Sequence, residues 1–145
     1  MTIGWQSGLA VVNRVNILLL EVARLTDLGF IRAAAAVGLT ALEHHLHVWC
    51  TRRLMGVQAP SMPLGVMIER LREAQVFDEK TYWYVRDCWK DGEQLLAGKS
   101  HRNENGEVTA DDVLEWLKFD LRPWIEELPI PDPRIGDSNL GERQV

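Results

Sequence analysis

The spacing of apolar residues constrains this chain most, because it recurs every three or four positions and never alternates as in a strand. This period places apolar side chains on one face of a helix, which has about 3.6 residues per turn. The stripes in 9–25 and 28–53 are Val11, Val15, Leu18, Val22 and Leu25, and Ala35, Leu39, Leu42, Leu46 and Trp49. The chain has 145 residues, 46% of them hydrophobic, so we predict one all-α, up-and-down bundle of four to five helices.

Residues that favour helix starts stand before the next predicted helices. Asp27 is predicted to cap the helix over 28–53. Ser61 is predicted to cap a short helix over 64–74, which tolerates Pro63 in its first turn. The sequence therefore predicts a loop over 56–63 between the second and third helices.

Two further helices follow. Asp78 is predicted to cap a helix over 79–99, and Thr109 with Asp112 resembles a capping box that opens the last helix. Pro123 has no amide proton, so we predict a kink in that helix near Phe119. The predicted buried stripe of the last helix is Val113, Leu117, Leu121, Trp124 and Leu128.

Composition changes at the end of the chain and sets the predicted domain organisation. Residues 129–145 are rich in Pro, Gly, Asp, Asn and Ser, which predicts a single helical domain over 1–128 and a flexible tail over 129–145. Two cysteines, Cys50 and Cys88, are too few for a disulfide framework. We predict that both are small core hydrophobes in a reducing compartment.

The charge balance excludes some classes of function. Sixteen basic and twenty-one acidic residues give a net charge of -5, which argues against a sequence-independent nucleic-acid binder. No basic segment precedes an apolar run at the start, and Arg14, Glu21 and Arg32 interrupt the longest apolar stretches. The sequence therefore predicts a cytoplasmic protein with no secretory signal and no membrane span.

Three short motifs follow one another in a specific order. The first, in an alanine-rich helix, is Ala41-Leu42-Glu43 with Leu46. The second, at the end of a long helix, is Gly98-Lys99-Ser100-His101. The third, at the start of the last helix, is Thr109 with Asp111 and Asp112. Over about 30–128 this order resembles the HEPN family of all-helical domains, which includes many metal-independent ribonucleases. The resemblance implies a HEPN-like bundle, a homodimer, and a role in bacterial defence, toxin–antitoxin or stress systems.

The same resemblance points to a site at His101, with one departure from the family's pattern. Ribonucleases of the family carry an Arg separated from the His by about four to six residues, and those positions here hold Gln94, Leu95 and Leu96. In active relatives the His transfers protons, and the Arg stabilises the charge of the phosphorane. The candidate catalytic residues are His101 and Arg102, and the candidate ligand-binding residues are Lys99 and Arg86.

A second group of candidate ligands lies in the second predicted helix. His44, His47 and Cys50 recur every three residues, so they share one broad helical face, and such side chains bind zinc or iron. Another helix would have to supply the missing ligands, for which Cys88 is one candidate. Because no further partner stands out, we predict polar or half-buried imidazoles, with no metal and no cofactor.

Aromatic residues gather near the start of the fourth predicted helix, in Tyr82-Trp83-Tyr84 and at Trp89. Such clusters stack nucleic-acid bases, but large aromatics also dominate cores and subunit contacts. Tyr82 and Trp89 share one helical face with Leu96, which favours the core. The sequence has three small basic clusters, which are Arg52-Arg53, Arg70 with Arg72, and Lys99 with His101 and Arg102. We predict that each is solvated, or that together they line a modest site for an anionic ligand.

We therefore predict a degenerate HEPN-like domain that binds RNA, a nucleotide or a protein partner and does not cleave a substrate. Ala34, Gly38 and Ala41 form a flat face on the second helix, through which we predict that two copies pair. Two alternatives remain open, a metal-independent endoribonuclease that uses His101 and a structural adaptor recognised through its aromatic face.

Overall fold

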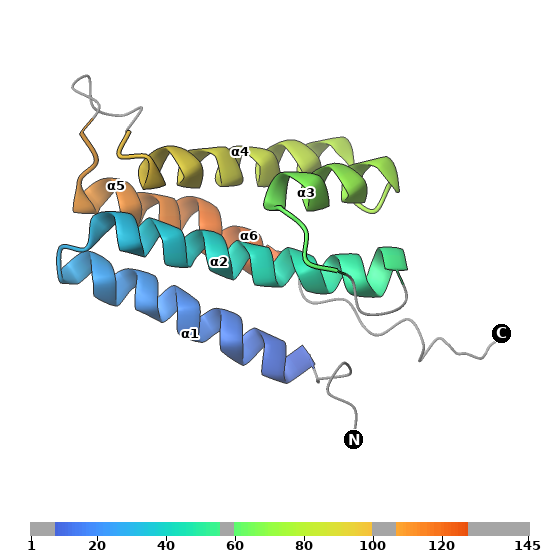
Figure 1. The fold of residues 1–145 in the computed structure, drawn as a ribbon, viewed down its shortest axis with the longest axis horizontal. Helices are drawn as coiled ribbons and strands as arrows, with labels where there is room; N and C mark the ends of the chain where they lie inside the picture. Colours follow the sequence, from blue (N-terminus) through green and yellow to red (C-terminus); the bar gives the residue numbers. More distant parts are fainter. Residues whose placement is uncertain (1–7, 56–59, 100–106, 128–145) are drawn as a thin grey trace, which may run out of the picture.

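The computed structural model describes residues 8–55, 60–99 and 107–127, and these ranges contain helices and no strand (Figure 1). The elements are α1 (Gly8–Asp27), α2 (Ile31–Cys50), the π-helical turn η2 (Thr51–Met55), α3 (Leu64–Glu73), α4 (Glu79–Leu96), α5 (Ala110–Glu115), the π-helical turn η3 (Trp116–Leu121) and α6 (Arg122–Glu127). The prediction of an all-α bundle is confirmed. The predicted tail over 129–145 lies outside the described residues.

α2 lies at the centre of the bundle. It packs against α1, α3, α4 and α5, and Figure 1 shows α1 and α4 on opposite sides of it. The members of the predicted stripes that are buried in the core are Val15, Val22, Ala35, Leu39, Leu42 and Leu46. Leu18, Leu25 and Trp49 are half-buried and pack against that core. The apolar period of the sequence therefore marks the faces that hold the bundle together.

The turn between α1 and α2 contradicts the prediction that Asp27 caps the second helix. Asp27 is the last residue of α1, and Gly29 follows with φ of +87°, a left-handed conformation that favours glycine. The amide of Phe30 donates to the carbonyl of Leu25 at 2.9 Å, which closes the end of α1. α2 therefore begins at Ile31, and no side chain caps it.

α4 ends earlier than predicted for a similar reason. Gly98 has φ of +80°, and the amide of Lys99 donates to the carbonyl of Gln94 at 2.8 Å, so the helix ends at Leu96. α3 is closed in the same way by Gln75, which has φ of +62°. Within the described ranges, Gln75 is the one residue other than glycine with a positive φ.

The predicted N-terminal caps are correct for two helices, α4 and the last one, and wrong for two, α2 and α3. Asp78 accepts a hydrogen bond at 2.7 Å from an amide in the first turn of α4, and this bond lowers the pKa of its carboxyl. Thr109 and Asp112 form the predicted capping box. Ser61 does not cap α3, because that helix begins directly after Pro63 and no side chain caps it.

α5, η3 and α6 follow one another without a break and form the C-terminal arm. Where a kink is predicted, near Phe119, the structure has the π-helical turn η3, in which the amide of Arg122 donates to the carbonyl of Leu117. Pro123, which follows Arg122, has no amide proton for a regular helical hydrogen bond. The predicted stripe is confirmed at Val113, Leu117, Leu121 and Trp124, while Leu128 lies outside the described residues.

The indole ring of Trp116 fills the space between the C-terminal arm, α2 and α4. A Cβ atom added to Gly92 on α4 would lie 2.5 Å from this ring, and one added to Gly38 on α2 would lie even closer. The indole N–H donates to the carbonyl of Cys88 at 2.9 Å. Trp116 therefore fits only because both facing helix positions lack a side chain.

This packing contradicts the predicted dimer contact on α2. Ala34 and Ala41 have 0% exposure, and Gly38 is buried under Trp116 of the same chain. The flat face receives a large side chain of its own chain, and a second copy cannot reach it in this fold. A dimer requires a different surface.

Replacing Gln75 with glycine is expected to raise the free energy of unfolding by about 1 kcal/mol, because a left-handed conformation costs a residue with a side chain about that much. Urea unfolding followed by circular dichroism measures the change. The matched control is Gly29→Ala, where an added Cβ meets no atom within 4 Å. Backbone strain alone is expected to destabilise that control by about 1 kcal/mol. Unchanged stability in Gln75→Gly would contradict the strain at this position.

Candidate functional site

The family-like motif stands at the C-terminal end of α4. Lys99 is exposed there, whereas the candidate catalytic residues His101 and Arg102 lie outside the described residues. Arg86 lies ten residues before Leu96, which is about 15 Å along the helix. The structure therefore does not bring the two candidate ligand-binding residues, Lys99 and Arg86, together.

The helix end has a guanidinium that sequence reasoning missed. At the positions where the family carries Arg, Gln94 is neutral and exposed, Leu95 is buried and Leu96 is half-buried. Arg32, in the first turn of α2, donates from Nε to the carbonyl of Leu96 at 2.8 Å. The contact joins residues 64 positions apart, so no local pattern predicts it. A cation at a helix C-terminus is favoured by the helix dipole.

His44, His47 and Cys50 do not form a metal centre. Across the described part of the chain, no three His, Cys, Asp or Glu side chains come together as metal ligands would. His44 and His47 are half-buried, while Cys50 is fully buried in the core. Burial, and to a smaller extent the charge of Arg14, lowers the pKa of His44. His44 and His47 are therefore half-buried imidazoles on α2.

Both cysteines lie in the core, as predicted. Cys50 is 0% exposed and Cys88 is 2% exposed. Burial raises the pKa of the Cys50 thiol to about 11 and raises that of Cys88 further. Because the thiolate is the nucleophile and the metal ligand, both groups are inert near neutral pH.

The aromatic cluster of α4 divides between core and surface. Tyr82 is 3% exposed, which confirms its predicted core position, whereas Trp83 is 47% exposed. The guanidinium of Arg86 lies 5.3 Å from the centroid of the Trp83 ring, and the ammonium of Lys90 lies 4.5 Å from that of Trp89. Trp83 and Trp89 therefore each hold a cation of their own helix.

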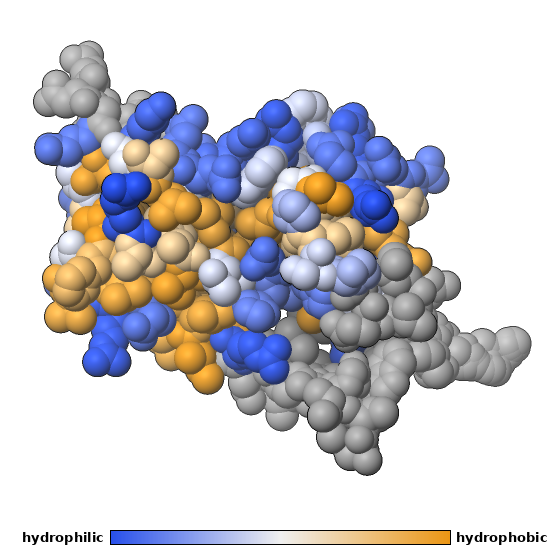
Figure 2. Space-filling view, in the orientation of Figure 1, coloured by the Kyte–Doolittle hydropathy of each residue, from blue (hydrophilic) through white to orange (hydrophobic). Residues whose placement is uncertain are grey.

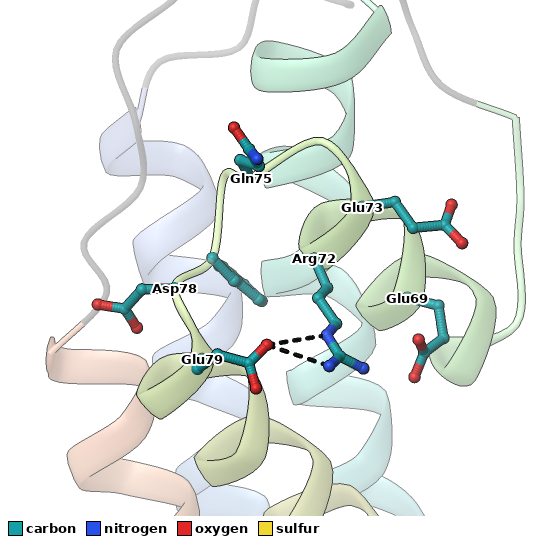
Figure 3. Close-up of a pocket in the computed structure, with 7 residues that line it drawn as sticks. Glu69, Arg72, Glu73, Gln75, Asp78 and Glu79 are labelled. Atoms are coloured by element: carbon teal, nitrogen blue, oxygen red, sulfur yellow. Dashed lines mark hydrogen bonds and ion pairs between the residues drawn. The ribbon is translucent and has the colours of Figure 1, made fainter.

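A pocket opens where α3 ends and α4 begins (Figure 3). Its lining consists of Glu69, Arg72, Glu73, Gln75, Phe77, Asp78 and Glu79, which is four carboxylates and one cation. Arg72 donates to Oε1 of Glu79 from Nη2 at 3.0 Å and from Nε at 3.2 Å, and it lies 4.2 Å above the ring of Tyr82. The Tyr82 hydroxyl donates to Glu69 at 2.5 Å, and this bond raises the pKa of Tyr82. Carboxylates outnumber cations in this pocket, and Arg72 is the one member of the Arg70–Arg72 cluster that lines it.

Large apolar side chains are exposed on the outer face of α1 and in the turn after it. Ile17 and Leu20 are 65% exposed, Leu28 is 60% exposed and Phe30 is 59% exposed. These four residues are called the apolar surface below. Figure 2 shows hydrophobic side chains gathering over α1 and α2, while α3 and α4 are mostly hydrophilic. Large apolar side chains left exposed in this way are candidate contacts with other molecules.

None of the described helices is long and apolar enough to cross a membrane. Comparison of the chain with protein-family models, with curated proteins and with solved structures finds no match. The HEPN resemblance therefore stays a prediction that depends on the sequence motifs alone. The described features that bear on function are the apolar surface, the outer face of α4 and the helix end beside Arg32.

Both thiols are expected to resist alkylation in the folded protein, because burial keeps them protonated. Iodoacetamide treatment at mildly alkaline pH, read by intact mass, measures this reactivity. The same treatment in guanidinium chloride should label both cysteines and serves as the control. Rapid labelling of Cys50 without denaturant would contradict its place in the core.

Proposed function

We propose that this chain is a non-catalytic, HEPN-like binding domain that recognises a protein partner in a bacterial defence, toxin–antitoxin or stress system, and that it works as a homodimer. The observation that carries the binding role is the apolar surface, whose side chains are 59–65% exposed. Fully burying one such side chain contributes about 1.5–3 kcal/mol. A partner that covers the surface therefore gains substantial affinity from these positions.

The distribution of charge favours a protein over RNA as the partner. Affinity for nucleic acid comes largely from cations that meet phosphates, and this chain has a net charge of -5. Arg72 is bonded to Glu79, and Arg86 and Lys90 lie on tryptophan rings. Arg32 is bonded to a backbone carbonyl. These contacts involve four of the sixteen basic residues. The negative net charge and the exposed apolar side chains together favour a protein partner.

The non-catalytic role is supported by the residues before His101. Cleavage of RNA needs proton transfer and a fixed donor that stabilises the phosphorane, and loss of such a donor costs about a hundredfold or more. Leu95 is buried and Gln94 carries no charge, so neither supplies that donor. Arg32 is the nearby guanidinium in the described ranges, and it donates to the carbonyl of Leu96.

The apolar surface provides the direct test of the binding role. The double variant Ile17→Glu/Leu20→Glu places two charges where a partner would pack, and we expect at least tenfold weaker binding. The tagged full chain captures its partner from cells of its own source, and calorimetry then measures affinity for the purified partner. The control Ser61→Glu adds one such charge at an exposed position before α3, outside α1 and the turn after it, and should bind normally. Equal affinity of the double variant and the wild type would contradict the proposal.

A parallel assay with single-stranded RNA separates the alternatives. We expect no cleavage by the purified chain, with chelator present or absent. Turnover that His101→Ala abolishes would establish the ribonuclease instead. RNA binding without cleavage, lost in Lys99→Ala, would establish RNA as the partner.

A further inference from the structure

The outer face of α4 carries a tryptophan between charges of both signs. Trp83 is 47% exposed, and four charged residues stand within four positions of it on either side. The α4 row is defined as Glu79, Lys80, Trp83, Arg86 and Asp87. Figure 1 shows α4 on the side of the bundle opposite α1, so the row is remote from the apolar surface.

The α4 row is symmetric about Trp83. Seven residues make nearly two turns of a helix, so Glu79 and Arg86 share one flank of α4 while Lys80 and Asp87 share the other. On each flank the two charges have opposite signs and lie almost equally far before and after Trp83. The row therefore complements itself when two copies run in opposite directions.

We infer that two copies of this chain pair through α4, antiparallel, with Trp83 beside the two-fold axis. In an antiparallel two-fold contact each flank faces the same flank of the other copy. Glu79 then lies opposite the partner's Arg86, and Lys80 lies opposite the partner's Asp87. The symmetry repeats each pair, which gives four ion pairs around the two indoles. A parallel contact would set Glu79 opposite the partner's Lys80 and Arg86 opposite the partner's Asp87, so these four charges fit either direction. Lys90 selects the antiparallel one, because it lies seven residues after Trp83, close to the contact line, and would meet its own copy in a parallel pair.

Trp83 is already held in place for such a contact. Its indole N–H donates to Oε2 of Glu79 at 3.2 Å, and its ring meets Tyr82 edge-on at a centroid distance of 5.0 Å. The guanidinium of Arg86 lies 5.3 Å from the ring centroid. A side chain that is fixed before association loses little rotamer freedom on binding. Fixed aromatic side chains of this kind are typical centres of interfaces.

The acidic pocket extends the same complementarity. Lys90 lies seven residues after Trp83, so in the antiparallel pair it faces the partner's turn between α3 and α4. In each copy Glu73 and Asp78 line the pocket at that turn, where carboxylates outnumber cations. The excess negative charge of the pocket therefore lies where a cation of the other copy arrives.

This inference rests on the homodimer of the proposed function and supplies its surface. It does not depend on the apolar surface or on the identity of the protein partner. It also replaces the α2 contact, whose small residues are buried within one chain.

Sedimentation velocity on the full chain tests the pairing, and we expect a wild-type dimer at micromolar concentration. Lys80→Glu and Asp87→Lys each place like charges across one flank, so each variant alone should dimerise at least tenfold more weakly. Mixed in equal amounts, the two variants should form a heterodimer, because an acidic flank then meets a basic one. Arg24→Glu and Glu126→Lys make the same charge changes at exposed positions on α1 and α6 and should dimerise as the wild type does. Trp83→Ala should also weaken the dimer.

Three outcomes would overturn the inference: a wild type that stays monomeric at its highest soluble concentration, single reversals that dimerise normally, or a mixture that gives no heterodimer. Normal dimerisation of the single reversals would place the dimer on another face and leave the proposed function standing. A monomer that still binds its protein partner would remove the homodimer alone. Failure of partner capture with an intact, charge-sensitive dimer would instead remove the binding role of the apolar surface.

Discussion

The indole ring of Trp116 occupies space that Gly38 leaves on α2 and Gly92 leaves on α4. A glycine inside a helix costs about 1 kcal/mol relative to alanine, so the local preference of both helices opposes these residues. Packing outweighs that preference, because a Cβ at either position would collide with the ring. The indole N–H is satisfied by the carbonyl of Cys88, so the contact buries no unpaired donor at this point.

This contact decides which surfaces remain for other molecules. The small-residue face of α2, which includes Ala34 and Ala41, is buried inside the chain. The outer faces of α1 and α4 are left on opposite sides of the bundle (Figure 1). One exposes Ile17 and Leu20, and the other holds Trp83 among charges of both signs. Two different associations, with a protein partner and with a second copy, can therefore occur on one chain without competing.

Features of the fold that depend on neighbours in sequence were predictable. The capping box of Thr109 and Asp112 and the apolar stripes follow from residues a few positions apart. Contacts between distant segments were not predictable. A small residue such as Gly38 indicates that another group packs closely against the helix, but it does not identify that group, which here is the side chain of Trp116 from the C-terminal arm. The bond from Arg32 to the end of α4 likewise joins two helix ends that only the fold brings together. At Gly29 two local signals competed, and the left-handed glycine outweighed the preceding aspartate.

A double-mutant cycle between Gly38→Ala and Trp116→Leu tests most directly whether Trp116 sets the spacing of the helices. Urea unfolding of the four proteins gives each free energy of unfolding. In the wild-type background, Gly38→Ala should destabilise by about 2 kcal/mol through overpacking. In the Trp116→Leu background the collision is removed, so the same substitution should be neutral or stabilising by up to about 1 kcal/mol through helix propensity. An equal effect of Gly38→Ala in both backgrounds would contradict the role of the ring.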